Sequence, residues 1–358
     1  MATLPANAGH PTLVNWAKFL DPNGKAYKIA ELLNQSNELM QYLPWIEGNL
    51  PTGHKASVRA GLPTVQFRRF YQGVAVSKSD RAIIEDTCAM QSGRSEVDCD
   101  LADLNGDTAA FRLSEAISFI EAQTQAAAVA FMYGDASTNK DGITGLTPRY
   151  NSLSASVNTS ANIIDSGGTG SDNTSVWLLV LGPETITGIF PKGSKAGLVH
   201  KDLGEIDAFD NQTPPARYRA YAETWDWKFG LHVKDWRYAV RIANIDVSDL
   251  IARTGTQALT ASTALLYTMI DALNKIPSMG MGTAVFLAGR TAKAALSKMA
   301  MDKSQNAVRF SEALDQFGKV APGSVGGTGT GLVGGQLLFQ SVPVLTVDKI
   351  SSAETRVV

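Results

Sequence analysis

The stretch from Trp225 to Lys234 constrains the fold more than any other part of this sequence. Every second residue from Trp225 to Val233 is aromatic or aliphatic, and the residues between them are polar or glycine. Because successive side chains of a strand point to opposite faces of a sheet, this alternation predicts a strand with one buried face. It places His232 on the polar face, where we expect a solvated or hydrogen-bonded ring. Stacking of the aromatic rings on bases or sugars is the alternative, but the alternation favours packing in a core.

The sequence also predicts one long helix, Asp107–Tyr133. A turn at Asn105-Gly106 precedes it, and Gly134 ends it. At about 1.5 Å per residue, such a helix is roughly 40 Å long and would span a whole domain. Residues at three- and four-residue spacing predict a single buried stripe along it: Leu113, Ile117, Ile120, Thr124, Ala127 and Phe131.

The composition is that of a globular protein with a substantial core. With 358 residues the chain exceeds the usual size of one domain, so we expect two lobes or one large composite fold. The apolar fraction of 44% is ordinary for a globular protein. The net charge of −2 lacks the basic excess of a protein dedicated to coating DNA.

The cysteine content and the N-terminus predict a chain made in a reducing cytosol. Cys88 and Cys99 are too few for a disulfide framework, and a bridge between them is the alternative to two free thiols. The N-terminus lacks the basic start and apolar core of a signal peptide. The longest purely apolar run, Ala126–Met132, is too short to span a bilayer, so we expect no membrane partner.

Residues 1–78 are predicted to form an arm and a hairpin, neither with a core of its own. The arm, residues 1–51, holds one amphipathic segment, Ala26–Leu43, whose apolar stripe must be buried on its own domain or on a neighbour. Residues 52–78 predict a long β-hairpin with strands Lys55–Ala60 and Thr64–Tyr71 around a turn at Gly61–Pro63. A ribbon of two strands with little apolar content is marginal in water, so we expect it to lie against another surface.

Charge is distributed unevenly around this predicted hairpin. The hairpin contains no acid and five basic residues, which are Lys55, Arg59, Arg68, Arg69 and Lys78. Between residues 84 and 107 there are seven acids against one arginine, and they include Glu85, Asp86, Glu96 and Asp98. Arg59, Arg68 and Arg69 of one subunit could therefore pair with the acidic stretch of another. Two solvated faces that never meet are one alternative, and nucleic-acid binding by the hairpin is a second.

The rest of the chain alternates between predicted strands and helices. After an exposed loop at Ser152–Thr174, strands are predicted at Val176–Gly182 and Ile186–Phe190, and a sheet-like pattern continues from Trp236 to Ile242. The last third predicts a helix at Asp249–Lys275, a strand at Ala284–Ala288, a helix from Thr291 to Met301, and strands at Leu337–Phe339 and Val342–Val347. The predicted fold class is therefore α+β.

No motif predicts a catalytic residue, a cofactor-binding residue or a metal ligand. The glycine pattern at Gly329–Gly334 matches a dinucleotide-binding motif, but a strand-forming stretch follows where that motif needs the start of a helix. A near match to a phosphate-binding loop at Gly188–Ser194 has serine where the lysine belongs. The four histidines are scattered, and no nucleophile elbow supports a Ser-His-Asp triad. We therefore expect a protein that is not an enzyme and that uses no cofactor.

Three segments resemble the major capsid proteins of tailed bacteriophages, in a branch found in short-tailed and related phages. They are Leu104–Gln123 (LNGDTAAFRLSEAISFIEAQ), Trp177–Glu205 (WLLVLGPETITGIFPKGSKAGLVHKDLGE) and Trp225–Asp246 (WDWKFGLHVKDWRYAVRIANID). With their flanks, the resemblance extends over most of the chain between Thr52 and Leu345. It implies the Hong Kong 97-like capsid fold, which is an α+β fold.

The resemblance implies a place in that fold for each part of the chain. It implies an N-terminal arm at 1–51, an extended loop at 52–78, a peripheral domain at 79–246 with its spine helix at 107–133, an axial domain at 247–335, and C-terminal strands at 336–358. In the commonest members of the fold, the closing peripheral strands follow the axial domain. Here the strong predicted strands precede it, so either the element order is permuted or the boundaries differ.

The function that the resemblance implies is assembly of the icosahedral phage head, a virion shell around double-stranded DNA. Hexamers and pentamers would form in the host bacterial cytoplasm, with portal, scaffolding and decoration proteins as further partners and non-specific contact with packaged DNA. The candidate intersubunit contacts are Lys55, Arg59, Arg68, Arg69, Lys78, Glu85, Asp86, Glu96 and Asp98. A phage appendage or carbohydrate-binding structural protein and a nucleotide-binding enzyme are the alternatives. Neither explains an arm and a basic hairpin that lack cores of their own.

Overall fold

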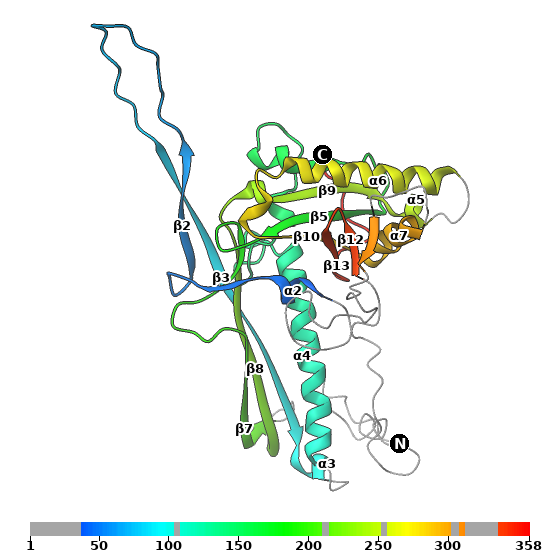
Figure 1. The fold of residues 1–358 in the computed structure, drawn as a ribbon. Helices are drawn as coiled ribbons and strands as arrows, with labels where there is room; N and C mark the ends of the chain where they lie inside the picture. Colours follow the sequence, from blue (N-terminus) through cyan, green and yellow to red (C-terminus); the bar gives the residue numbers. More distant parts are fainter. Residues whose placement is uncertain (1–36, 104–107, 210–214, 252–255, 302–307, 312–335) are drawn as a thin grey trace, which may run out of the picture. The chain divides into compact units, whose positions relative to one another are not determined.

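The computed structural model describes residues 37–103, 108–209, 215–251, 256–301, 308–311 and 336–358 (Figure 1). Helices and strands are both abundant among them, which confirms the α+β class. In chain order the elements are α2 (Leu39–Tyr42), β1 (Trp45–Glu47), β2 (Gly53–Gly61), β3 (Asp80–Asp98), α3 (Cys99–Asp103), α4 (Thr108–Tyr133), η1 (Thr147–Arg149), η2 (Asn158–Asn162), β4 (Ile163–Asp165), β5 (Asn173–Leu181), β6 (Ile186–Phe190), β7 (Leu198–Phe209), β8 (Arg217–Val233), η3 (Trp236–Tyr238), β9 (Ala239–Asp246), α5 (Val247–Ile251), α6 (Thr256–Lys275), η4 (Met279–Met281), β10 (Thr283–Ala288), α7 (Arg290–Met301), β11 (Val308–Ser311), β12 (Gln336–Phe339) and β13 (Val342–Thr346).

The described chain forms two compact units. The smaller unit includes Ala89–Ala127 and Ser194–Phe229, and the larger unit includes Ser36–Cys88, Ala128–Gly193 and Gly230–Val358. The elements β3, α4 and β8 contribute residues to both units, so neither unit is a continuous piece of sequence. The domain boundaries expected from the resemblance stay predictions.

A mixed sheet organises the larger unit. Its central strand β5 pairs antiparallel with β9 on one side and with β10 on the other, and β10 pairs parallel with β13. Strands β12 and β11 extend the β13 edge, and β4 pairs with β9. Strand β6 pairs with β1 and with the last residues of β8. Every residue of β5 is buried, as expected for a central strand with both faces covered.

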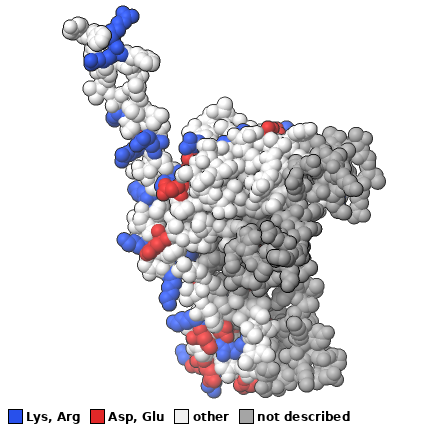
Figure 2. All heavy atoms as spheres, viewed as in Figure 1, with Lys and Arg blue, Asp and Glu red and all other residues white. Residues whose placement is uncertain are grey.

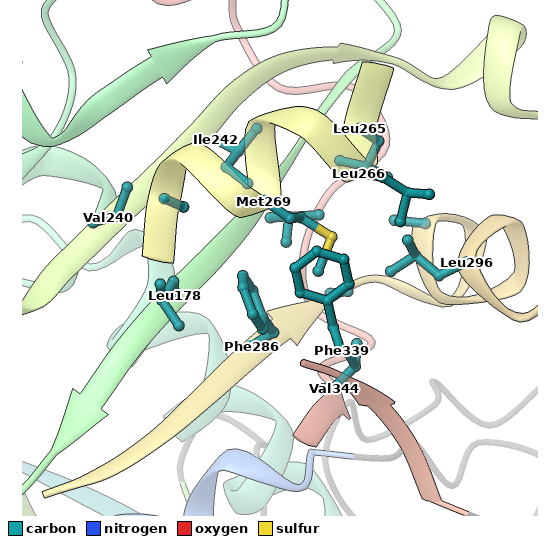
Figure 3. Close-up of a cluster of buried hydrophobic side chains, with 14 of the residues drawn as sticks. Leu178, Val240, Ile242, Leu265, Leu266, Met269, Phe286, Leu296, Phe339 and Val344 are labelled. Atoms are coloured by element: carbon teal, nitrogen blue, oxygen red, sulfur yellow. The ribbon is translucent and has the colours of Figure 1, made fainter. Parts of the chain in front are cut away.

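The main core of the larger unit lies between this sheet and the helices α6 and α7. Figure 3 shows Leu178 and Phe286 of the sheet together with Met269 of α6 and Leu296 of α7. Phe286 and Phe339 meet edge to face, with 5.6 Å between ring centroids. Burial of each such side chain contributes about 1.5–3 kcal/mol, so this cluster supplies much of the stability of the unit.

In the smaller unit, α4 packs against β8. Strands β7 and β8 form a long antiparallel ribbon, and the ring of Trp225 on β8 stacks on Phe119 of α4 with 4.7 Å between centroids. The side-chain amide of Gln123 on α4 donates a hydrogen bond to the carbonyl oxygen of Trp225 at 2.7 Å. Arg112 of α4 reaches Glu223 and Asp202 on the ribbon, so apolar and polar contacts both join helix and strand.

Several elements predicted from the sequence are confirmed. Helix α4 agrees with the predicted helix within one residue at its start, and β6 agrees in full. Trp225 and Phe229 are almost completely buried, which confirms that β8 has a buried apolar face. Strands β10, β12 and β13 and helix α7 agree with their predictions within two residues. The helix predicted at 249–275 overlaps α5 and α6, and residues 252–255 between them lie outside the described residues. Residues 236–238 form a 3₁₀ turn instead of a strand.

The predicted hairpin is wrong in its second strand. Strand β2 pairs with the beginning of β3, from Gly53 opposite Thr87 to Gly61 opposite Asp80. The predicted strand Thr64–Tyr71 belongs to a long loop, residues 62–79, because its β-forming side chains have no strand beside them to pair with.

One prediction of burial is wrong. The first half of the apolar stripe on α4 is exposed: Leu113, Ile117 and Ile120 have exposed fractions of 63%, 42% and 43%. His232 was expected to have a solvated or hydrogen-bonded ring, and the second of these holds: the ring is bonded to the buried carboxylate of Asp86 and has an exposed fraction of 1%. The amphipathic segment predicted at 26–43, the turn before α4 and the glycine pattern at 329–334 lie wholly or largely outside the described residues.

Candidate functional site

The most exposed part of the larger unit is the hairpin of residues 53–88, which β2 and the start of β3 form with the loop 62–79 (Figure 1). Few hydrogen bonds hold the loop together. The Ser77 hydroxyl donates to the carbonyl oxygen of Thr64 at 2.9 Å, and a turn joins Arg69 and Gln72. Within that turn Tyr71 has a φ of 64°, in the left-handed region that residues with a side chain rarely adopt. The loop therefore has a defined path but no core beneath it.

Apolar side chains cover this loop and lie in solvent. Phe67 and Tyr71 each have an exposed fraction of 106%, and Phe70 has one of 94%. We call the following set the loop surface: Leu62, Val65, Phe67, Phe70, Tyr71, Val74 and Val76. The expectation of a hairpin with little apolar content is therefore wrong. Soluble monomers rarely expose a contiguous apolar set of this size unless it binds something.

Basic side chains accompany the loop surface. Figure 2 shows lysine and arginine side chains along the hairpin and at its tip. Arg59, Arg68, Arg69 and Lys78 are exposed. Lys55 lies 3.6 Å from Glu85 on the opposite strand, in a half-exposed pair of the kind that contributes at most about 1 kcal/mol.

The predicted acidic partners have contacts within their own chain. Glu96 pairs with Arg94 at 2.6 Å, and the Asp98 carboxylate accepts a hydrogen bond from the backbone N–H of Asp100. Glu96 and Asp98 are only partly exposed, whereas Glu85 is exposed. Asp86 differs, because it is buried and is held by groups of its own subunit.

A buried polar network joins the hairpin to the rest of the larger unit through Asp86 of β3. The Asp86 carboxylate accepts hydrogen bonds from Arg149 at 2.7 Å, from Nδ1 of His232 at 2.7 Å and from the backbone N–H of Val233 at 3.1 Å. Burial alone would raise the pKa of Asp86, but the bond from His232 and the charge of Arg149 outweigh it and lower the pKa below its usual value. Asp86 therefore stays ionised and anchors the hairpin root.

The hairpin root also lies unusually close to β8. A Cβ atom at Gly230 would lie 2.7 Å from the carbonyl oxygen of Thr87, so only glycine fits there without a shift of the backbone. Sequence reasoning missed Arg149 and His232 as anchors, because they are 63 and 146 positions from Asp86 and no local pattern joins them.

A second exposed apolar surface lies on the first half of α4. Leu113, Ile117 and Ile120 form one stripe, and the same stripe continues to Ala127 and Phe131, which are fully buried. One side of the helix thus changes from exposed to buried along its length. The exposed half is a candidate for contact with another chain.

Few features of the described residues support a metal site, a phosphate site or a membrane span. No three His, Cys, Asp or Glu side chains among them are placed to hold a metal ion. Residues 188–190 of the near match to a phosphate loop belong to strand β6. Cys88 and Cys99 both have free thiols. Within the described ranges, no helix is long and apolar enough to cross a membrane.

Comparison with known proteins agrees with the geometry. The family model described as major capsid protein GP7 matches residues 21–358. A chain in the solved structure of bacteriophage epsilon15 is similar over 100% of this chain and 99% of its own length, with 25% sequence identity and a TM-score of 0.74. No curated protein sequence matches significantly.

More distant similarities include two further capsids. The capsid of bacteriophage JBD30 has 8% identity and a TM-score of 0.45, with coverage of 90% of this chain and 95% of its own. The capsid of a native GTA particle has 11% identity and a TM-score of 0.43, with coverage of 63% and 95%. The family match and the epsilon15 similarity show a Hong Kong 97-like fold and a virion protein that forms capsid shells. The chain belongs to the major capsid protein GP7 family.

Proposed function

We propose that this capsid protein builds an icosahedral head from hexamers and pentamers, in which the hairpin of each subunit lies across a neighbouring subunit. The loop surface is the single observation that carries this proposal. It presents three aromatic rings to solvent at the end of a ribbon that has no core of its own. A second copy of the chain provides such a partner once per subunit, because every subunit of a shell has both a hairpin and a neighbour.

The size of the loop surface suits a contact that is weak singly and strong when repeated. Burial of about 150 Å² on each of Phe67, Phe70 and Tyr71, at about 25 cal/mol per Å², would contribute roughly 11 kcal/mol before the costs of association. Those costs are about 4–15 kcal/mol, so a single contact is marginal. In a closed shell each subunit is held by several contacts at once, and modest contacts suffice.

We also propose that charge orients this contact. Arg59, Arg68, Arg69 and Lys78 are exposed on the hairpin, and surface acids such as Glu96 and Asp98 of a neighbour would complement them. Lys55 and Glu85 form an exposed pair within one chain, and in the shell each would pair with an opposite charge of a neighbour instead. Asp86 would act from inside its own subunit by holding the hairpin root.

Membership of the capsid family supports a proposal for the remaining partners. We propose that subunits assemble in the host bacterial cytoplasm, with scaffolding, portal and decoration proteins, and that the shell makes non-specific contact with packaged double-stranded DNA. A role without catalysis fits a chain whose exposed surfaces are apolar and basic. The net charge of −2 favours few phosphate contacts per subunit.

Variants of the loop surface test the proposal. Under conditions in which the wild-type chain forms particles, we expect Phe67→Ser/Phe70→Ser/Tyr71→Ser to reduce the particle yield at least about tenfold, since each lost contact is repeated throughout the shell. The unfolding midpoint of the unassembled subunit should not change, because these side chains are exposed. The matched control, with leucine at the same three positions, keeps most of the apolar area and should retain particles. Sedimentation and electron microscopy give the yield, and normal particles from the serine variant would refute the proposal.

Charge reversal tests the electrostatic part separately. Arg68→Glu/Arg69→Glu should lower particle yield while the subunit folds normally. The matched variant Arg68→Lys/Arg69→Lys keeps both charges and should assemble. If Arg68→Glu/Arg69→Glu and Arg68→Lys/Arg69→Lys gave equal particle yields, charge would not orient the contact.

A further inference from the structure

Two histidine rings meet at the root of the hairpin. His54 of β2 lies opposite Asp86 of β3 in the strand register. Its ring contacts that of His232 on β8 edge to face, with 4.6 Å between centroids and 66° between planes. The pair therefore joins the first strand of the hairpin to β8.

The ring of His54 is poorly placed to carry a second proton. Its Nδ1 atom is buried and has no hydrogen-bond partner among the described residues. Protonation would turn this atom into a buried N–H donor with no acceptor, which costs more than leaving a lone pair unpaired. The contact with His232 is thus suited to a neutral His54.

The charged groups around His54 also oppose a positive ring. Lys234, the residue after β8, acts against a positive His54 and is itself paired with Glu184, while His232 of β8 donates its Nδ1 proton to Asp86. Asp86 on β3 is the acid that favours a charged His54, but it already accepts hydrogen bonds from Arg149 and from the backbone of Val233. A proton on His54 would therefore add a positive charge near Lys234 and Arg149, whose carboxylate partners Glu184 and Asp86 are already engaged.

We propose that His54 is a pH-sensitive latch, which holds the hairpin root against β8 while its ring is neutral and loosens the root when the ring is protonated. The inference goes beyond shell building, because it concerns the freedom of the hairpin within a single subunit. If the root loosens, the hairpin that carries the loop surface can point in different directions, while the core between β5, α6 and α7 stays closed.

The expected pH window follows from the His54 environment. Burial lowers the pKa of His54 below its usual 6.5, and His232 and Lys234 lower it further against the opposing effect of Asp86. A lowered pKa means that the closed root prefers the neutral ring. The latch is complete above pH 6.5, weakens as the pH falls below that value, and reaches its limit once the pH has passed the lowered pKa. Asp86 titrates in a separate and more acidic window, because its own pKa lies below 3.8.

Hydrogen exchange of the full-length, unassembled subunit tests the latch. Protection factors for β2 and residues 80–88, corrected for intrinsic rates at pH 7.5 and 5.5, should fall on acidification, by up to about tenfold for each unit by which the His54 pKa is lowered. In His54→Gln, which cannot titrate, the fall should disappear. His200→Gln is the matched control: it removes a half-exposed histidine of β7 and should keep the wild-type fall. Protection that does not change with pH in the wild type, or a fall that persists in His54→Gln, would overturn the proposal.

A direct titration keeps the test decisive if His54→Gln folds poorly. The chain has four histidines, so ¹³C-labelled histidine gives four ring signals to follow by NMR. The His54 signal should titrate below pH 6.5, and His232→Gln should move its midpoint upward by removing a neighbour that disfavours the charge. A midpoint at or above 6.5 that does not respond to His232→Gln would show that the ring senses neither burial nor its neighbours, and the latch would be rejected.

Discussion

Replacing Glu354 by glutamine perturbs a deeply buried ion pair of the larger unit. Arg241 and Glu354 lie 2.8 Å apart with exposed side-chain fractions of 2% and 5%. The other Glu354 oxygen accepts a hydrogen bond from the Tyr133 hydroxyl at 2.5 Å, and Ser175 also donates to this carboxylate. The pair fastens the C-terminal segment to β5 and β9.

The expected loss is large because glutamine has nearly the same shape but no charge. Arg241 would keep its bonds to Ser175 and to the carbonyl oxygen of Tyr150, yet its buried charge would lose its counter-ion. The glutamine NH₂ group would also face a hydrogen-bond donor. Removing one partner of a buried pair costs about 3–5 kcal/mol, so we expect the free energy of unfolding to fall by that amount.

Urea unfolding of the unassembled subunit measures this loss. The control Glu205→Gln removes one partner of an exposed pair with Arg219 and should cost at most about 1 kcal/mol. The double variant Arg241→Met/Glu354→Leu removes both buried charges and should cost less than Glu354→Gln alone, because no uncompensated charge remains. A loss below about 1 kcal/mol in Glu354→Gln would refute the reasoning.

Three further predictions concern the hairpin root. Gly230→Ala should destabilise the subunit by about 1–3 kcal/mol in urea unfolding, because the new Cβ would lie 2.7 Å from the Thr87 carbonyl oxygen. In the control Gly73→Ala the new Cβ meets no atom within 4 Å, so the free energy of unfolding should not change. Asp86 stabilises the fold above pH 3.8, and this contribution is lost as the pH falls through its lowered pKa. Asp86→Asn should therefore flatten that part of an acid-unfolding curve, and an unchanged curve would contradict the role of the Asp86 charge. Burial, with the Asp86 charge, raises the pKa of Cys88 to about 11 from 9.0. Iodoacetamide should therefore alkylate Cys88 roughly 100-fold more slowly at pH 7.5 than it alkylates the amino acid cysteine in solution, and equal rates would contradict the burial.

Local patterns in the sequence predicted the elements that local forces determine. The alternation from Trp225 to Val233 places successive side chains on opposite faces, and β8 follows that rule for its apolar residues. The helix α4 ends beside Gly134, where a Cβ would lie 2.5 Å from the carbonyl oxygen of Ala130, so the glycine identified as a stop is required by the packing.

Long-range contacts explain what the sequence could not predict. His232 has the place of a polar-face residue in the alternation, and only the distant Asp86 makes burial favourable for it. The strand partner of β2 begins at Asp80, beyond a loop whose aromatic residues have high β propensity and suggest a strand themselves. Pairing with a more distant segment leaves no mark on the periodicity of either strand.

The candidate contacts show a related limit of sequence reasoning. Leu113, Ile117 and Ile120 have the spacing of a buried stripe, and periodicity does not distinguish burial within a chain from burial against another one. Phe67 and Tyr71 show a different limit, since a contact surface predicted from basic residues alone gives no weight to aromatic ones. A stretch rich in both arginine and aromatic residues is a useful signal, because interfaces are enriched in both.

A cryo-electron microscopy map of closed shells made by this chain tests the central claim most directly. We expect a neighbouring copy to cover the hairpin loop of each subunit, so that the rings of Phe67 and Tyr71 are buried between the two chains. Their exposed fraction of 106% in the single chain should then fall below about a third. Closed shells in which both rings remain in solvent would contradict the proposal that the hairpin holds the subunits together.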